Sequence, residues 1–284
     1  MLRVFIYPNL EKPHAWELTK NASRLLSGLG CGIIFTYSVP RELTDNAIIS
    51  GSIKEAVTLC DIIVTIGGDG TILNIAELAA REKRKLLGIN CGRLGFMASM
   101  EAEDLDKLGK LCTGEYTTES RMMLSASVTR RDGVVSSYTA LNDIVITHGF
   151  NYNINDFTVM ADDIKISSLR ADGLIFSTPT GASAYSLSAG GPLIEPTLVC
   201  IEFIQICPHS LFARSMILSA DKVLTVRFEA DGEIGISSDG SDPDPLTKND
   251  IISIGRSPYR LDLIDITGDN YFKSIGSKLM QPAK

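Results

Sequence analysis

The spacing of hydrophobic positions divides the chain into two parts. Over about the first ninety residues, short apolar runs alternate with longer amphipathic segments, which is typical of the strands and helices of an open α/β sheet. This pattern predicts strands at residues 3–7, 32–36, 62–66 and 85–89. It predicts helices at residues 15–29, 52–60 and 71–81, and a further helix across residues 102–111.

The second part has a different texture. From Met122 to Ile266, many short apolar runs are separated by Gly, Asp, Asn and Ser, and one convincing helical pattern lies around residues 183–189. The runs predict strands at residues 124–128, 143–147, 157–161, 174–177, 200–207, 223–228 and 234–238. Short strands at this spacing are typical of a mostly antiparallel β domain.

The two textures predict a fold of class α/β plus all-β. We expect an N-terminal open α/β (Rossmann-like) domain over residues 1–118 and a C-terminal, mostly antiparallel β-sandwich domain over residues 119–266. A chain of 284 residues accommodates two unequal domains. The tail, about residues 267–284, is polar and weakly helical over residues 271–279, and a return to the first domain is one course open to it.

Composition narrows the class of protein. The net charge of −7 argues against a broad nucleic-acid-binding face, because such faces depend on clustered Lys and Arg. The six cysteines contain no Cys-x-x-Cys pair, which argues against a zinc site and favours reduced thiols. We find neither a signal-peptide pattern at the start nor a run of membrane-spanning length, and we therefore expect a cytoplasmic location and no membrane partner.

A glycine-rich turn follows the predicted strand at residues 62–66. It reads Gly67-Gly68-Asp69-Gly70-Thr71 and leads into the predicted helix at residues 71–81, the place where open α/β sheets bind ligands. The glycines let phosphates approach the main chain, and the start of the helix offers free N–H groups. A carboxylate beside bound phosphates repels them unless it holds a metal ion or takes a proton from the nucleophile, which makes Asp69 a candidate general base.

Structural alternatives to this phosphate site remain open at this stage. Gly-rich turns between strands and helices are common, and Asp often caps a helix. The spacing does not fit a Walker motif, because no Gly-Lys-Ser/Thr follows. The glycines at residues 28, 30 and 32 follow a predicted helix and precede a strand, which is the reverse of the order in a dinucleotide-binding fingerprint.

A second segment, residues 170–192, is dense in hydroxyl groups. It reads Arg-Ala-Asp-Gly-Leu-Ile-Phe-Ser-Thr-Pro-Thr-Gly-Ala-Ser-Ala-Tyr-Ser-Leu-Ser-Ala-Gly-Gly-Pro. Hydroxyls and amides at the start of its predicted helix suit a ribose, an amide or a phosphate. A Ser/Thr-rich capping turn before a helix of small residues is the structural alternative.

Together the two segments resemble the NAD kinase family, which pairs Gly-Gly-Asp-Gly-Thr with a later Thr-Pro-Thr-Gly turn and Ser-Ala-Gly-Gly-Pro. Four further stretches agree with recurrent family segments: residues 88–96, 141–143, 208–211 and 238–240. The resemblance runs from about Ile63 to Gly240, with a fainter echo at residues 271–272 and 278–279.

The resemblance implies an enzyme that transfers the γ-phosphoryl group of ATP to the 2′-hydroxyl of the adenosine ribose of NAD, giving NADP and ADP. It implies an NAD site between the two domains, Mg²⁺ or another divalent cation as cofactor, and a homodimer or homotetramer. Asp69 is then the catalytic base. The phosphate-binding residues are Gly67, Gly68, Gly70 and Thr71, and the residues that bind NAD are Asp69, Gly70, Phe96, Asn142, Asp143, Arg170, Asp172, Thr180, Ser183, Ala184, Tyr185 and Ser188.

Three positions depart from the family pattern. Asp143 replaces a commoner Glu, Ala182-Ser183 stands where Ser-Thr is usual, and the tail lacks a familiar Leu-Arg pair. Two other classes of function compete with an NAD kinase. A lipid kinase or phosphofructokinase shares the Gly-Gly-Asp-Gly turn but is not expected to carry the segment at residues 178–192, and a non-catalytic nucleotide sensor has no need of Asp69.

Overall fold

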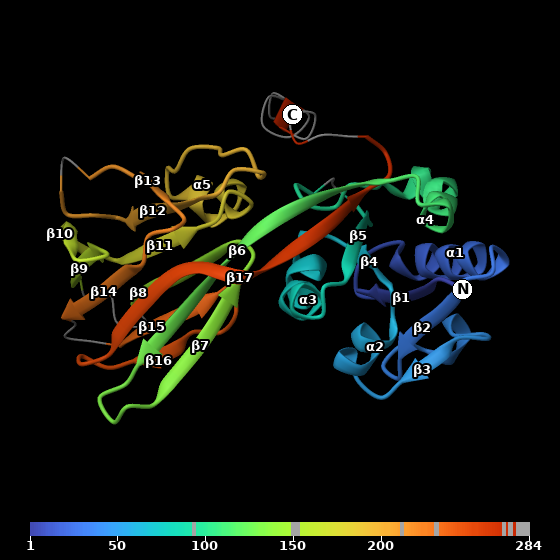
Figure 1. The fold of residues 1–284 in the computed structure, drawn as a ribbon, viewed down its shortest axis with the longest axis horizontal. Helices are drawn as coiled ribbons and strands as arrows, with labels where there is room; N and C mark the ends of the chain where they lie inside the picture. Colours follow the sequence, from blue (N-terminus) through green and yellow to red (C-terminus); the bar gives the residue numbers. More distant parts are fainter. Residues whose placement is uncertain are drawn as a thin grey trace. The chain divides into compact units, whose positions relative to one another are not determined.

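The computed structural model divides into two compact units, Met1–Arg121 with Arg260–Lys284, and Met122–Tyr259 (Figure 1). It describes residues 1–92, 95–148, 154–210, 213–229, 233–268, 271 and 275–276. Most of the tail, for which a helix was predicted, lies outside the described residues. Within the described part of the chain, the structure contains no helix long and apolar enough to cross a lipid bilayer.

The first unit is built on a parallel sheet in the order β3-β2-β1-β4-β5. Its strands are β1 (Arg3–Pro8), β2 (Gly32–Thr36), β3 (Ile48–Ser50), β4 (Ile62–Gly67) and β5 (Lys85–Asn90). Its helices are α1 (Ala15–Gly28), α2 (Ile53–Leu59) and α3 (Asp69–Arg81). Two short 3₁₀ elements, η1 (Arg41–Leu43) and η2 (Ala102–Gly109), and a short helix α4 (Lys110–Thr113) complete it.

Helices cover both faces of this sheet. Val4 and Ile6 pack with α1, η2 and α4 in one apolar cluster, whereas Phe5, between them, points to the opposite face. That opposite face is covered by α2 and α3, which bury residues such as Ile72 and Ile75. Because both faces are covered, every residue of β4 is buried, which explains its continuous apolar run.

The second unit is a sandwich of antiparallel sheets. One sheet runs β10-β9-β14-β17, with β6 paired to β17 and to β7, and the other runs β13-β12-β11-β8-β15-β16. The strands of the first are β6 (Thr117–Thr129), β7 (Val135–Ala140), β9 (Asn155–Ala161), β10 (Ile164–Ala171), β14 (Leu224–Glu229) and β17 (Ile251–Asp265). Those of the second are β8 (Asp143–His148), β11 (Gly173–Ser177), β12 (Cys200–Ile206), β13 (Met216–Ser219), β15 (Ile234–Ser238) and β16 (Asp244–Leu246).

One core lies between the inner faces of the two sheets. Phe157 and Val159 of β9 alternate with less buried residues, which is the period of two expected of a strand with one buried face. On the other sheet Phe176 and Phe203 stack with ring centroids 5.2 Å apart. The predicted class, α/β plus all-β with an antiparallel sandwich, is confirmed.

Two predicted helices needed correction. The pattern at residues 102–111 forms the 3₁₀ element η2 and only one turn of α-helix, because Leu105, Leu108 and Leu111 recur every third residue, the spacing at which 3₁₀ side chains align. The helix predicted at residues 183–189 is split into η3 (Gly181–Ser183) and α5 (Tyr185–Ser188). The backbone of Ala184, at φ −104° and ψ −124°, interrupts it.

Several strands were not predicted from the sequence. The apolar signal of β10 is weak, because most of its residues are partly exposed and its register shifts between Lys165 and Ser167. The long strand β17 contains Gly255 and Pro258, which divide its apolar pattern. Its first residues pair with β14, and Leu263 pairs in parallel with Leu86 of β5.

Candidate active site

The glycine-rich turn of the first unit joins β4 to α3. Gly67 ends the strand, Gly68 is the N-cap, and α3 begins at Asp69, two residues earlier than predicted. The amide of Gly68 donates to Thr71 Oγ1 at 3.3 Å. A Cβ on Gly67 would lie 2.1 Å from the same oxygen, so this position requires glycine because Thr71 approaches the backbone closely.

Asp69 anchors a neighbouring loop. Its Oδ2 accepts a hydrogen bond from the amide of Phe96 at 2.7 Å, and its Oδ1 accepts from the amides of Met97 and Ala98, each at 3.2 Å. Gly95 leaves room for this contact, because a Cβ there would lie 1.8 Å from Oδ1. The carboxylate therefore holds residues 96–98 against the start of α3, and three of its roughly four acceptor sites are occupied.

Phe96 and Arg121 are the other notable side chains of this region. The Phe96 ring is half-buried, and its centroid lies 6.4 Å from that of Tyr271. Arg121, on β6, is almost fully buried, and burial lowers the pKa of its guanidinium. Arg121 was not among the predicted site residues, because one arginine in a strand carries no motif.

In the second unit, Asp239 anchors the segment that contains Asn142 and Asp143. Its Oδ2 accepts from the amide of Leu141 at 2.7 Å, and its Oδ1 accepts from the amides of Asn142 and Asp143 at 2.7 and 3.2 Å. Asp239 lies in a turn with φ +49°, a conformation that Asp tolerates better than most residues. From the sequence, Asp239 stood out only as part of the family-like segment at residues 238–240.

Asp143 is a buried acid beside this anchor. Only 5% of it is exposed, and burial, followed by the nearby charge of Asp239, raises the pKa of its carboxyl to about 7. The charge of this group therefore changes close to neutral pH.

The hydroxyl-rich segment is bound directly to the Asn142 segment. Thr178 Oγ1 donates to the carbonyl of Leu141 at 2.6 Å, and the amide of Thr178 donates to the carbonyl of Asn142 at 2.8 Å. Only glycine fits at position 181, because a Cβ there would lie 2.2 Å from the carbonyl oxygen of Asn142. The structure thus brings Asn142, Asp143 and Thr180 together at the ends of β8 and β11.

Two buried oxygen atoms in this cluster have no hydrogen-bond partner among the described residues. They are Asn142 Oδ1 and Thr180 Oγ1. Buried polar atoms are normally paired, so these two unpaired oxygens are candidates for ligand contacts.

The residues of η3 and α5 differ in exposure. Ser183 Oγ donates to the carbonyl of Thr180 at 3.2 Å, whereas Tyr185 is 46% exposed and Ser188 is also exposed. Ser186, on the same helix, is buried, and its Oγ donates to Glu202 Oε2 at 2.5 Å. Glu202 is fully buried, which raises the pKa of its carboxyl, and its place inside the apolar run of β12 was the one available sequence signal.

Arg170 and Asp172 lie at the junction of β10 and β11. The Arg170 Nε atom is 3.2 Å from Asp156 Oδ1, and both side chains are more than half exposed. The amide of Asp172 donates to the carbonyl of Ile206 at 3.0 Å, and its carbonyl accepts from Thr147 Oγ1 at 3.3 Å. The ligand roles expected of Arg170 and Asp172 stay predictions.

Family models account for most of the chain. The model of the ATP-NAD kinase N-terminal domain matches residues 6–116, and the model of the C-terminal domain matches residues 141–266. The chain belongs to the ATP-NAD kinase family. The resemblance predicted from the two motifs is therefore confirmed, and the family class is a phosphotransferase with an alcohol acceptor.

Relatives named NAD kinase are similar over three quarters of the chain or more. That of Caldanaerobacter subterraneus subsp. tengcongensis is 35% identical over 283 residues, covering 99% of this chain and 100% of the relative. That of Symbiobacterium thermophilum is 42% identical over 221 residues, covering 77% of this chain and 78% of the relative.

Two solved structures share the fold of this ATP-NAD kinase family member. Yeast NADH kinase complexed with NADH matches with a TM-score of 0.89 at 23% identity, over 100% of this chain and 89% of that chain. An NAD kinase from Archaeoglobus fulgidus in complex with ATP matches with a TM-score of 0.74 at 23% identity, over 99% of this chain and 100% of that chain. At this identity the likeness concerns the fold alone.

Proposed function

We propose that the protein is an NAD kinase that transfers the γ-phosphoryl group of ATP to the 2′-hydroxyl of the adenosine ribose of NAD, giving NADP and ADP. The observation that carries this proposal is the similarity over nearly the whole chain to relatives named NAD kinase, together with an intact Gly-Gly-Asp-Gly turn. Residues 178–192 of the hydroxyl-rich segment separate this function from that of lipid kinases and phosphofructokinases.

The first unit supplies the phosphate-binding part. The amides at the start of α3 are available to an anion, since Gly70 is exposed and Gly68 is partly exposed. Gly67 and Thr71 fix the shape of the turn through their close contact. Asp69 acts as general base on the ribose hydroxyl with the acceptor capacity that the loop amides leave, and Phe96 lies beside the adenine.

The second unit supplies the NAD-binding part. Asn142 Oδ1 and Thr180 Oγ1 are buried acceptors without partners, and they suit ribose hydroxyls or an amino group of the base. Asp143 shares their cluster, although its side chain is one methylene shorter than the commoner Glu. The adenosine-lining residues on η3 and α5 are Ser183, Ala184, Tyr185 and Ser188, and Asp172 and Arg170 bind the nicotinamide end and a phosphate.

Mg²⁺ fits this site as an ion delivered with ATP. Among the described residues, no group of three or more His, Cys, Asp and Glu side chains is arranged to hold a metal ion. Mg²⁺ is usually bound through substrate phosphates, several waters and one or two carboxylates, so the phosphates of ATP and water would supply most of its ligands here. The ion would neutralise charge on the transferring phosphoryl group. A homodimer or homotetramer and a cytoplasmic location are further parts of the proposal and rest on the family resemblance and the composition.

One assay tests the proposed function. Purified protein is incubated with ATP, Mg²⁺ and NAD, and NADP is measured with an NADP-specific dehydrogenase. We expect NADP to form in proportion to ADP, and excess chelator to stop the reaction. Nucleotide binding without ADP formation would show a sensor, and phosphorylation of a lipid or sugar in place of NAD would show one of the rival kinases.

A further inference from the structure

Arg121 is a buried cation, and the described residues leave two of its nitrogen atoms without a hydrogen-bond acceptor. It lies on β6 and is 5% exposed. Its Nη2 donates to Glu119 Oε2 at 2.5 Å, while its Nε and Nη1 atoms have no partner among the described residues. Glu119 is itself partly exposed, with 35% of its side chain accessible, so the ion pair leaves much of the buried guanidinium uncompensated.

A buried guanidinium with unpaired donors destabilises the ligand-free protein. Burying a charge is unfavourable unless it is paired and hydrogen-bonded, and burial is also the largest influence on the pKa of Arg121, which it lowers. A hydrophobic residue of similar volume would fill the same space without this cost. A buried arginine with free donors therefore calls for a group that supplies acceptors.

The position of Arg121 indicates what that group is. Besides Glu119, the groups that act on it electrostatically are Tyr271 and Asp69, and Asp69 is the first residue of α3. The free N–H groups of the first turn of α3 and the guanidinium of Arg121 therefore both act on the surroundings of Asp69. Both favour a negatively charged ligand.

Arg121 also resolves a difficulty in the sequence of the turn. Residues 67–71 contain an aspartate and no Lys or Arg, and the protein as a whole carries a net charge of −7. Enzymes that transfer phosphoryl groups rely on fixed positive charge at the phosphates. Arg121 is distant in the sequence from the turn and adds that charge in the folded unit.

We infer that Arg121 is a phosphate-binding residue, whose free N–H groups donate to phosphate oxygens of the nucleotide held at the start of α3. This inference rests on the proposed function, because it takes the nucleotide to be the phosphoryl donor. Arginine suits the role, because its guanidinium stays charged and its donors match the geometry of phosphate oxygens.

Binding measurements on the full chain test the inference. The probes are ATP, inorganic tripolyphosphate and adenosine, measured by titration calorimetry on the wild type, Arg121→Gln and Arg121→Lys. We expect Arg121→Gln to weaken ATP and tripolyphosphate about tenfold or more and to leave adenosine within about twofold, because charge-assisted hydrogen bonds to phosphate are lost. Arg121→Lys keeps the charge but not the donor geometry, so we expect its affinity for ATP and tripolyphosphate to lie between those of the wild type and Arg121→Gln.

Thermal stability provides a second test. If Arg121 had a purely structural role, replacing it would lower the Tm of the ligand-free protein, whereas the inference predicts that the Tm is kept or raised. We expect Arg121→Met to keep or raise the Tm of the ligand-free protein, because it removes an uncompensated buried charge, and to lose the rise in Tm that tripolyphosphate causes in the wild type. A fall in Tm together with unchanged tripolyphosphate affinity in Arg121→Lys would overturn the inference.

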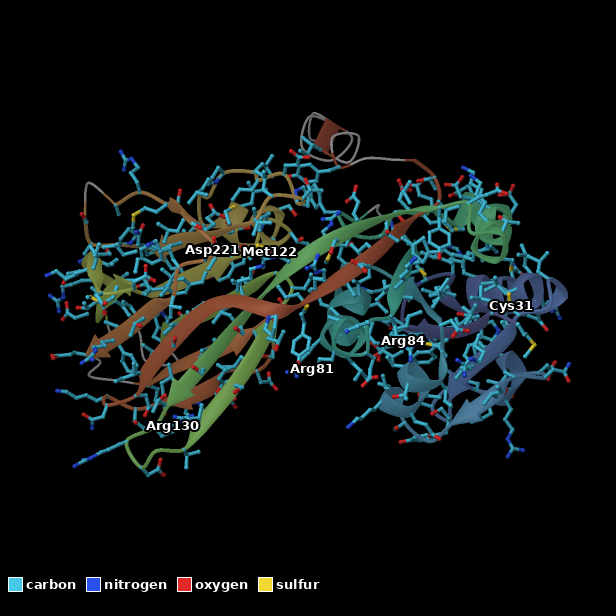
Figure 2. The ribbon with its side chains drawn as sticks, viewed as in Figure 1. Cys31, Arg81, Arg84, Met122, Arg130 and Asp221 are labelled. Carbon is cyan, nitrogen blue, oxygen red and sulfur yellow. The ribbon has the colours of Figure 1, made fainter. Side chains whose placement is uncertain are left out.

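Arg130 offers a matched control. Arg130, labelled in Figure 2, directly follows β6. Its Nη1 atom lies 2.8 Å from Oδ2 of Asp250, whose side chain is only 1% exposed. Arg130→Gln breaks a partly buried ion pair of the same type, so we expect a lower Tm with tripolyphosphate affinity within about twofold of the wild type.

The outcomes separate this inference from the proposed function. If the wild type binds tripolyphosphate in an Arg121-dependent way but forms no NADP, the proposed function fails and the phosphate-binding role stands. If the wild type forms NADP while Arg121→Gln and Arg121→Lys both bind ATP within twofold of it, the role of Arg121 is wrong and the proposed function stands.

Discussion

The two units of the protein use the same device to hold a loop. In the first unit, Asp69 accepts hydrogen bonds from the amides of residues 96–98 at 2.7 to 3.2 Å. In the second unit, Asp239 accepts from the amides of residues 141–143 over the same range. A carboxylate that takes three backbone donors replaces the secondary structure that these loop amides lack.

The surroundings make the two anchors chemically different. Asp69 begins a helix, whose N-terminus carries partial positive charge, and it interacts electrostatically with Arg121. Asp239 lies in a left-handed turn beside the buried Asp143, and its negative charge helps to raise the pKa of that neighbour. One hydrogen-bond pattern therefore stands beside the proposed anion-binding region in one unit and beside a titratable group whose pKa it helps to raise in the other.

The largest expected effect is on turnover. Asp69→Asn should lower kcat by roughly 10²–10⁴, because it removes the proton acceptor for a ribose hydroxyl, while NAD affinity stays within about tenfold. Steady-state rates and titration calorimetry on one folded preparation measure both quantities.

Asp239→Asn is the matched control for this experiment. It disturbs an equivalent anchor but leaves Asp69 in place, so its kcat should stay within about tenfold of the wild type. Equal losses of kcat in the two variants would mean that Asp69 acts by holding residues 96–98 and that the base lies elsewhere.

The second effect concerns pH and stability. The pKa of Asp143 is about 7 in the folded protein and near its ordinary value of about 3.9 in the unfolded chain, so the folded state binds an extra proton between those values. Stability from this group is therefore lost as the pH rises, by roughly 2–3 kcal/mol from pH 5 to pH 7. Urea unfolding at several pH values should show this fall in the wild type and a flatter profile in Asp143→Asn. Parallel profiles would contradict it.

The smallest effect is the direct loss of an anchor. Asp239→Asn places an amide group against one of three backbone donors, and an unsatisfied buried donor costs roughly 1–3 kcal/mol. The same change removes a negative charge next to Asp143 and lowers the folded-state pKa of that carboxyl, so the fall in stability with rising pH should be smaller and should end at a lower pH. Urea midpoints measured for this variant check both expectations, and an unchanged midpoint at pH 5 would show that the anchor contributes little.

Much of the fold was open to prediction from the sequence alone. Strands β1, β2, β4 and β5 of the parallel sheet form continuous apolar runs, because helices cover both faces, and their predicted bounds fall within one residue of those observed. The short edge strand β3, whose first two residues are exposed, was not predicted. Exposed strands such as β10 escaped prediction, because one weakly buried face leaves little hydrophobic signal. The glycine turn and the hydroxyl-rich segment were visible because short-range chemistry determines them.

The sequence by itself determined the family, the two kinds of unit, and the local motifs around Asp69 and Thr180. Only the tertiary structure decided which distant groups meet those motifs. Asp69 and the amides of residues 96–98 are separated by 27 to 29 positions, and Asp239 and the amides of residues 141–143 by 96 to 98 positions. The environments of Arg121 and Asp143 likewise follow from burial and from charges brought near by folding. The spacing of hydrophobic residues encodes periodicity and local geometry, whereas desolvation and electrostatic coupling depend on the positions of groups in space.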